Sequence, residues 1–146
     1  MKFPAWSITV AVFLIAGMVS VLAKQKATPT PAVAKIVHGK YLVESVAMCV
    51  DCHSPRDDKG EPIPGKVLKG SVLIFKPIAP MPVWADQAPN IAGLAGWEDD
   101  AAVKFLMTGL TSNNLRGRPP MPQYRFNRED AEAVVAYLKS LSTADK

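Results

Sequence analysis

The stretch Cys49-Val50-Asp51-Cys52-His53 decides how this sequence is interpreted, because its C-x-x-C-H spacing is the attachment signature of c-type haem. Two thiols three positions apart, at the end of a helix, can reach the two vinyl groups of one porphyrin. The adjacent His53 then directs its imidazole at the iron from the same side, and haem iron needs such a nitrogen ligand. The motif therefore predicts one covalently bound haem c, held through Cys49 and Cys52.

Three other uses of the two cysteines are open. A zinc site needs four ligands, only His38 and His53 could join the thiols, and adjacent Cys52 and His53 fit one tetrahedral ion poorly. A thioredoxin-like C-x-x-C pair is expected in a βαβ context, which the sequence does not show. A structural disulfide would leave His53 without a role. Haem attachment is the one use that accounts for Cys49, Cys52 and His53 together, so the sequence favours it.

The second axial ligand of the iron is expected to be a methionine in a stiff loop. Met48 adjoins the motif and cannot cross to the opposite face of the haem, while Met107 lies on the apolar stripe of a predicted helix, where methionine usually fills the core. Met81 and Met121 both stand between prolines, which stiffen a loop without secondary structure. We prefer Met121, which lies between two predicted helices, and keep Met81 as the alternative; either could instead pack on the haem edge.

Composition and charge exclude several protein classes. The 146 residues are 49% hydrophobic and 21% charged, as in a single globular domain rather than a disordered chain. The net charge is +4, but from residue 35 onward fourteen basic residues face thirteen acidic ones. A nucleic-acid-binding protein needs a basic face or stripe. Nucleic acid is therefore not an expected partner.

The N-terminal segment, residues 1–23, contains an uncharged apolar run at residues 4–23. Twenty helical residues span about 30 Å, the thickness of a bilayer core, which predicts a membrane anchor. The alternative is a cleaved signal peptide, because Val21-Leu22-Ala23 resembles a small-residue cleavage site. Residues 24–34 alternate threonine and proline and are expected to form an extended linker. Residues 35–146 remain as the folded domain.

Three main helices separated by long proline-rich loops are expected in that domain. They span residues 35–50, residues 98–108 with a stop at Gly109, and a last helix capped by Asn127. The last helix has the clearest apolar periodicity: Ala131, Val134, Val135, Leu138 and Leu141. Between the first two helices lie 47 residues with seven prolines, in which residues 72–75 could form a short strand. Such a long loop is unusual unless it wraps a cofactor.

With the C-x-x-C-H motif, Met121 and the terminal helix in view, the chain resembles class I cytochromes c. More narrowly, it resembles the single-haem, membrane-anchored or dehydrogenase-associated bacterial type. Less specific matches are Ala88-Pro89-Asn90-Ile91 leading to Gly96-Trp97, Pro119-Pro120-Met121-Pro122 and residues 130–141. In that family the first and last helices cross at a small residue and an aromatic, and Gly39 and Tyr137 stand at the matching positions.

The resemblance implies an all-α class I cytochrome c fold and one-electron transfer, without bond chemistry at the iron. It implies His53 and Met121 as axial ligands, and Trp97 as a residue that either donates to a haem propionate or fills the core. Arg116, Arg118, Arg125 and Arg128 bracket Met121 and could steer an acidic partner, neutralise the propionates or be merely solvated.

The function expected from the resemblance is a membrane-anchored electron carrier, serving a periplasmic dehydrogenase, respiratory complex or oxidase. The family's haem is attached outside the cytoplasmic membrane. We therefore expect a single-pass protein of the bacterial cytoplasmic membrane, with its haem domain on the periplasmic or outer face. The alternative is a haem sensor or peroxidase-like protein with an open sixth iron position.

Overall fold

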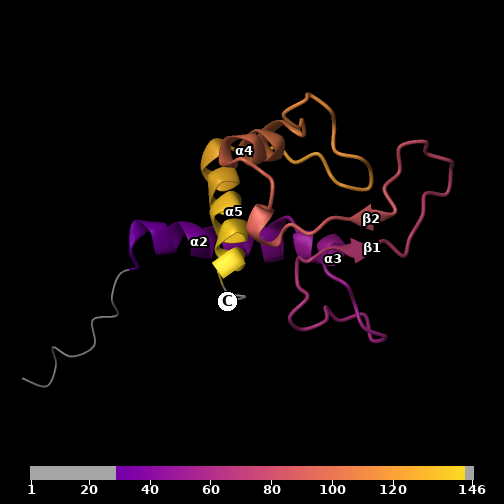
Figure 1. Ribbon diagram of the computed structural model, residues 1–146, viewed down its shortest axis with the longest axis horizontal. Helices are drawn as coiled ribbons and strands as arrows, with labels where there is room; N and C mark the ends of the chain where they lie inside the picture. Colours follow the sequence, from indigo (N-terminus) through magenta and orange to yellow (C-terminus); the bar gives the residue numbers. More distant parts are fainter. Residues whose placement is uncertain (1–28, 144–146) are drawn as a thin grey trace, which may run out of the picture.

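The computed structural model describes residues 29–143 (Figure 1). The predicted membrane anchor at residues 4–23 and residues 24–28 of the predicted linker lie outside the described residues. Within residues 29–143, no helix is both long enough and apolar enough to cross a bilayer.

The described part is mostly helical. It contains helices α2 (Pro31–Tyr41), α3 (Cys49–His53), α4 (Asp99–Thr108) and α5 (Arg128–Ser140). Shorter turns are η2 (Leu42–Val46), η3 (Ala92–Leu94) and η4 (Leu141–Thr143), and β1 (Ser71–Val72) pairs antiparallel with β2 (Gln87–Ala88). Figure 1 shows α5 crossing α2, with α4 at the end of α5 away from α2. The three long helices of the prediction are therefore present, and α3 is separate from the first of them.

The crossing of α2 and α5 depends on a glycine. A Cβ atom on Gly39 would lie 1.9 Å from the carbonyl oxygen of Ala133 and 2.9 Å from the Cβ of Tyr137. Only a residue without a side chain allows the two backbones to approach this closely. The buried Tyr137 donates from its hydroxyl to Glu44 Oε1 over 2.5 Å. The predicted pairing of Gly39 with Tyr137 at the helix crossing is confirmed.

Helix α2 begins at Pro31, so residues 31–34, which we expected to be extended, are helical instead. The hydroxyl oxygen of Thr30 accepts a 3.4 Å hydrogen bond from the amide of Val33, and Pro31 occupies the first turn. Proline is well suited to this position because the first amides of a helix have no intrahelical partner. Residues 31–34 therefore belong to the folded domain and not to the predicted linker.

The first helix was expected to continue to Val50, and this expectation is wrong. The amide of Ala47 bonds to the carbonyl of Leu42 over 2.7 Å, five residues back, which widens the helix into the π-helical turn η2. Met48 then adopts φ 50° and ψ 39°, a left-handed conformation that ends the helix. The chain restarts as α3 at Cys49, so the C-x-x-C-H residues have a helical turn of their own.

The other two helices follow their predicted ends closely. α4 has Glu98 as its N-cap residue and ends at Gly109, which is left-handed with φ 73°. α5 begins after Asn127, whose side chain accepts from the amide of Asp130 over 2.8 Å. Its predicted apolar stripe faces the core, with Ala131, Val134, Val135 and Leu138 buried and Leu141 half-buried.

Backbone amides of the long loop after α3 donate hydrogen bonds to the end of that helix and the residue after it. The amide of Gly70 donates to the carbonyl of His53 over 2.8 Å, and the amide of Leu68 donates to Ser54 Oγ over 2.9 Å. The strand expected at residues 72–75 is only Ser71–Val72, followed by one further bond from the amide of Leu73 to the carbonyl of Asp86. In this register residue 74 would face Ala85, whose amide donates instead to the carbonyl of Pro119 over 2.7 Å, so the pairing does not continue.

Candidate haem site

A cavity of about 650 Å³ lies between α3, η3, α4 and residues 111–122. Its volume falls within the range of roughly 300–1,000 Å³ typical of cofactor sites. Most of the side chains that line it are apolar, including Leu73, Leu94, Phe105 and Leu106. The five residues predicted from the sequence all line this cavity: Cys49, Cys52, His53, Trp97 and Met121.

His53 is held in one orientation by the loop that follows β2. Its Nδ1 lies 2.7 Å from the carbonyl oxygen of Pro89. Because a carbonyl only accepts, Nδ1 carries the proton and Nε2 keeps its lone pair for a metal. Burial lowers the pKa of His53, and the bond to Pro89 only partly opposes this, so the neutral ring is favoured. This is the support that metal-binding histidines usually receive from a second group.

The two cysteines are free thiols one helical turn apart. Burial raises the pKa of Cys49 to about 11, and burial together with the Asp51 carboxylate raises that of Cys52. Redox-active and metal-binding cysteines need thiolate character, which comes with a lowered pKa. Among residues 29–143, no three His, Cys, Asp or Glu side chains group closely enough to hold a metal ion. Both thiols line the cavity and are free to form bonds to a cofactor there.

Met121 is the loop methionine that reaches the cavity. Its amide donates to the carbonyl of Arg118 over 3.1 Å in a tight turn that contains a cis Pro119–Pro120 bond. A Cβ atom on Gly117 would lie 3.7 Å from Met121 Cγ and 3.0 Å from the ring of Phe105, so the turn packs against α4. The alternative, Met81, is 41% exposed, and it does not line the cavity.

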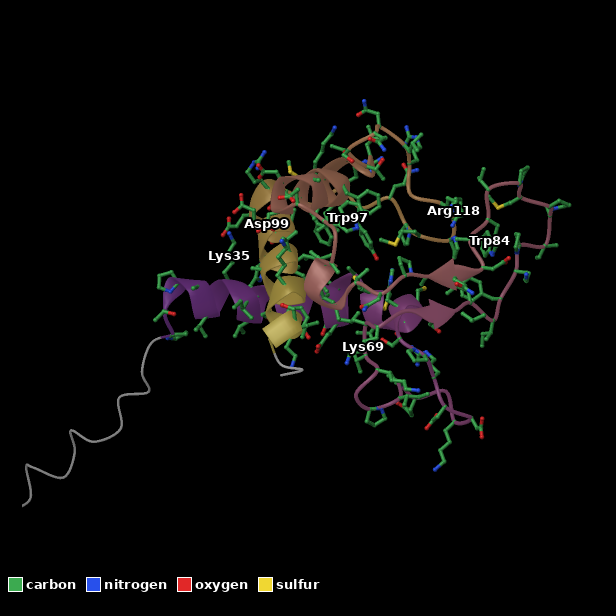
Figure 2. All side chains as sticks on the ribbon, in the orientation of Figure 1. Lys35, Lys69, Trp84, Trp97, Asp99 and Arg118 are labelled. Carbon is green, nitrogen blue, oxygen red and sulfur yellow. The ribbon has the colours of Figure 1, made fainter. Side chains whose placement is uncertain are left out.

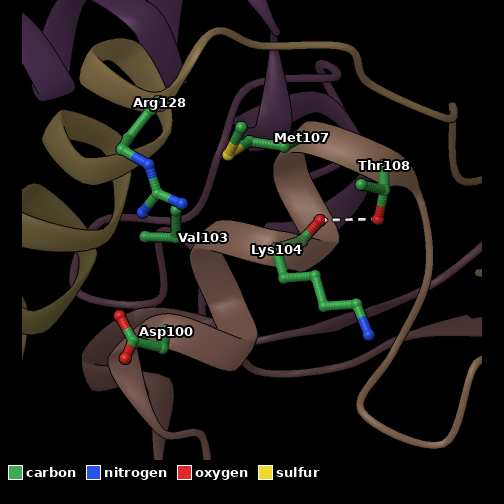
Figure 3. Close-up of a pocket in the computed structure, with 6 residues that line it drawn as sticks. All are labelled: Asp100, Val103, Lys104, Met107, Thr108 and Arg128. Atoms are coloured by element: carbon green, nitrogen blue, oxygen red, sulfur yellow. Dashed lines mark hydrogen bonds between the residues drawn. The ribbon is translucent and has the colours of Figure 1, made fainter.

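The other two methionines lie where a ligand opposite His53 is not expected. Met48 lines the cavity from the cysteine side. Met107 borders a separate hollow between α4 and Arg128 at the start of α5 (Figure 3). In that hollow the hydroxyl of Thr108 donates to the carbonyl of Lys104 over 2.7 Å, a bond within α4.

Trp97 is half-buried at the edge of the core and lines the cavity. Its ring centroid lies 5.6 Å from that of Phe105, at an interplanar angle of 56°. This contact fixes the indole against α4. Both roles predicted for Trp97, core packing and contact with the cofactor, are compatible with this position.

Sequence reasoning missed two residues of the site. The Pro89 carbonyl orients His53, and the only local signal was its place in the Ala88-Pro89-Asn90-Ile91 stretch. Tyr124 also lines the cavity, donates to the carbonyl of Ala47 over 2.5 Å and stacks on Phe126 at 5.2 Å. Burial raises the pKa of Tyr124 to about 12. No local pattern in the sequence indicates this contact.

Of the four arginines around Met121, two line the cavity and two lie outside it. Arg116 and Arg118 line the cavity, and Arg116 also donates to Gln123 Oε1 over 2.5 Å. Arg118 lies close to Trp84 (Figure 2), where the amide of Ala85 donates to the carbonyl of Pro119 over 2.7 Å. Arg125 bonds to the neighbouring carbonyl of Tyr124 over 2.7 Å, and Arg128 belongs to the separate hollow of Figure 3.

Residues 36–142 match the model of the family described as cytochrome c. The chain belongs to the cytochrome c family. It is 29% identical over 113 residues to the fructose dehydrogenase cytochrome subunit of Gluconobacter japonicus, covering 70% of this chain and 21% of that protein. It is 27% identical over 117 residues to the cytochrome c subunit of alcohol dehydrogenase (quinone) from Gluconobacter oxydans (strain 621H), covering 73% and 24% respectively.

Family membership implies covalently bound haem c and an electron-carrying role. The cavity fits this group, because it combines two free thiols, an oriented imidazole and a thioether in an apolar shell. The chain spans less than a quarter of the length of these two relatives. What those dehydrogenases oxidise is therefore not transferred to this protein.

Proposed function

We propose that this protein is a membrane-anchored, mono-haem c-type cytochrome that carries single electrons. Its donor is a periplasmic dehydrogenase or respiratory complex, its acceptor lies downstream, and it works as a subunit of such a complex. The observation that carries the proposal is the single cavity in which Cys49, Cys52, His53 and Met121 meet. Both relatives are cytochrome subunits of dehydrogenases, which supports the role as a subunit.

The residues of the cavity would each have a defined task. Cys49 and Cys52 on α3 would hold the porphyrin covalently, and His53, oriented by its hydrogen bond to the Pro89 carbonyl, would supply its Nε2 to the iron. The bound haem supplies one-electron chemistry between its ferrous and ferric states. Met121 would supply its thioether to the iron, and such a ligand would favour the ferrous state and raise the reduction potential. The apolar lining excludes water and acts in the same direction.

Trp97, Arg116 and Arg118 are the lining residues that we expect to contact the polar groups of the haem. We propose that the indole N–H of Trp97 donates to a haem propionate. Arg116 and Arg118 offset the propionate charge and present a cationic rim to an acidic partner. Electron-transfer contacts of this kind are usually small and transient.

The proposed location is the bacterial cytoplasmic membrane, with the haem domain on its periplasmic or outer face. The uncharged residues 4–23 support a single membrane anchor. Attachment of the family's haem outside the cytoplasm supports the orientation. Fractionation of cells that express the full chain tests this assignment, with accessibility to added protease as the readout of orientation.

A haem stain on a denaturing gel tests the central assignment. The full chain and a Cys49→Ser/Cys52→Ser variant are expressed with a c-type maturation system. Stain that stays with the full chain and is absent from the variant supports covalent haem, and quantified haem should equal one per chain. Stain that leaves the full chain on denaturation would overturn the proposal.

Carbon monoxide separates the carrier from a sensor or peroxidase-like protein. A ferrous iron with both axial positions filled binds the gas poorly, whereas an open sixth position binds it readily. We expect little change in the absorption spectrum of the reduced protein on addition of carbon monoxide. Rapid, complete conversion of the spectrum would favour the sensor or peroxidase-like function instead.

A further inference from the structure

Helix α2 packs on α5 with one face and carries apolar side chains on the opposite, exposed face. Gly39 marks the face that packs on α5, where Lys35 bonds to Glu132 and His38 to Asp130, each over 2.7 Å. Lys35 points toward α5 in Figure 2. Residues two positions before and after Gly39 lie about 200° around the helix, on its outer side. Those positions are Val37 and Tyr41, and Val33 precedes them by one further helical turn.

This outer stripe of Val33, Val37 and Tyr41 is exposed. Its side chains are 49%, 62% and 58% exposed, respectively. The three residues are spaced four apart, so they form a continuous row about 12 Å long. Lys40 flanks the row, is 59% exposed and pairs only loosely with Glu44 at 3.8 Å.

The chain that precedes α2 indicates what covers this stripe. The uncharged run ends at Ala23, and α2 begins at Pro31, so the residues that join them are 24–30. Seven residues reach at most about 25 Å when fully extended. If residues 4–23 occupy a bilayer, the start of α2 at Pro31 is tethered within about that distance of its surface, which gives the outer face of the helix a high effective concentration there.

We propose that the outer stripe of α2 lies on the phospholipid bilayer, so that this helix is an interfacial element of the haem domain. Apolar side chains in a row, a tyrosine and flanking lysines are typical of helices that rest in the headgroup region. Lys40 provides a cation for anionic lipid headgroups and can extend its charge outward from the row. The inference rests on the membrane anchor of the proposed function and adds the orientation of the domain.

Spin labelling of the haem-loaded full chain in phospholipid vesicles tests the proposal. Cys49 and Cys52 are consumed by the haem, so a nitroxide attaches at one introduced cysteine. The stripe position is Val37→Cys, and the matched controls are Lys40→Cys on the same helix and Asp58→Cys on an exposed loop. Vesicles of phosphatidylethanolamine and phosphatidylglycerol serve as the membrane. The readout is relaxation by oxygen, which concentrates in lipid, compared with relaxation by a water-soluble nickel chelate.

We expect the ratio of oxygen to nickel accessibility to be several-fold higher at position 37 than at position 58, with position 40 between them. Equal aqueous ratios at positions 37 and 58 would overturn the proposal. Protection at position 37 that comes with label-to-label broadening, and disappears on dilution with unlabelled protein, would assign the stripe to a second copy and overturn it as well.

Failure of this inference can be distinguished from failure of the proposed function. A chain that does not float with the vesicles removes the anchor and this orientation together. The haem stain and the carbon monoxide response still report on the electron-carrier assignment. A chain that floats, binds haem and shows an aqueous label at position 37 contradicts the interfacial helix alone.

Discussion

The hydroxyl of Tyr124 donates a 2.5 Å hydrogen bond to the carbonyl of Ala47, which lies 77 positions earlier in the chain. Ala47 is the residue at which the first helix ends, immediately before the left-handed Met48 and the cysteines of α3. Tyr124 follows Met121 by three positions and stacks on Phe126. One hydrogen bond thus links the loop that carries the proposed methionine ligand to the turn that starts the haem-attachment helix.

Replacing Tyr124 with phenylalanine should weaken this link without removing the ring. We expect Tyr124→Phe to lower the free energy of unfolding by about 1–2 kcal/mol, because the carbonyl of Ala47 loses its donor. We also expect a weaker thioether-to-iron charge-transfer band in the ferric protein, since the Met121 loop becomes less restrained. Denaturant titration and absorption spectroscopy measure the two effects. Tyr41→Phe, at a side chain that is 58% exposed, is the matched control, and equal behaviour of both variants would contradict the link.

The Gly39 contact predicts a large effect from the smallest side chain. Gly39→Ala would place a Cβ 1.9 Å from the Ala133 carbonyl oxygen, and backbone cannot move aside as a flexible side chain can. We expect a loss of roughly 3 kcal/mol or more in unfolding free energy, measured by thermal or denaturant unfolding of the haem-loaded protein. Lys40→Ala, next along α2, removes only an exposed ion pair and should change stability by less than about 0.5 kcal/mol. A fully stable Gly39→Ala variant would show that α2 and α5 are farther apart.

The parts of the fold that the sequence predicts well are those determined by neighbouring residues. Gly109 ends α4 because glycine adopts positive φ at little cost, and Asn127 caps α5 because its side chain reaches an amide three residues on. The start of α2 had a comparable signal in Thr30-Pro31. The alternation of threonine and proline around it favoured an extended chain instead, so the prediction there was wrong.

The parts that could not be predicted depend on distant contacts. Met48 is not a residue that favours a left-handed backbone, so nothing local indicates the break before Cys49. The acceptor for His53 lies 36 positions away at Pro89. The motif and the prolines around Met121 identified the candidate site because cofactor attachment constrains residue type and spacing directly. The hydrogen bonds that orient those residues depend on the tertiary fold.

Removal of the Met121 thioether should leave a ligand position on the haem iron free for carbon monoxide. In Met121→Ala we expect loss of the thioether-to-iron charge-transfer band and ready binding of carbon monoxide by the reduced protein, because the variant lacks the ligand that we propose for the iron. The reduction potential should also fall, since the ligand that favours the ferrous state is gone. Met81→Ala is the matched control, because Met81 stands between prolines as well but does not line the cavity. The opposite pattern, with the band lost only in Met81→Ala, would make Met81 the ligand.

Tyr137 should make the stability of the α2–α5 crossing sensitive to alkaline pH. Burial, followed by the hydrogen bond to Glu44, raises the pKa of Tyr137 above its ordinary value of 10.0. A raised pKa in the folded state means that the stabilisation is fully present below the unfolded-state pKa and is lost as the pH rises beyond it. Tyr137→Phe should therefore be less stable than the natural chain at neutral pH, and the difference in unfolding free energy should narrow as the pH rises from about 10 toward about 12. Denaturant unfolding of both proteins, followed by circular dichroism across this range, measures the gap. A gap that stays constant would show that the Tyr137 hydroxyl titrates alike in the folded and unfolded chains.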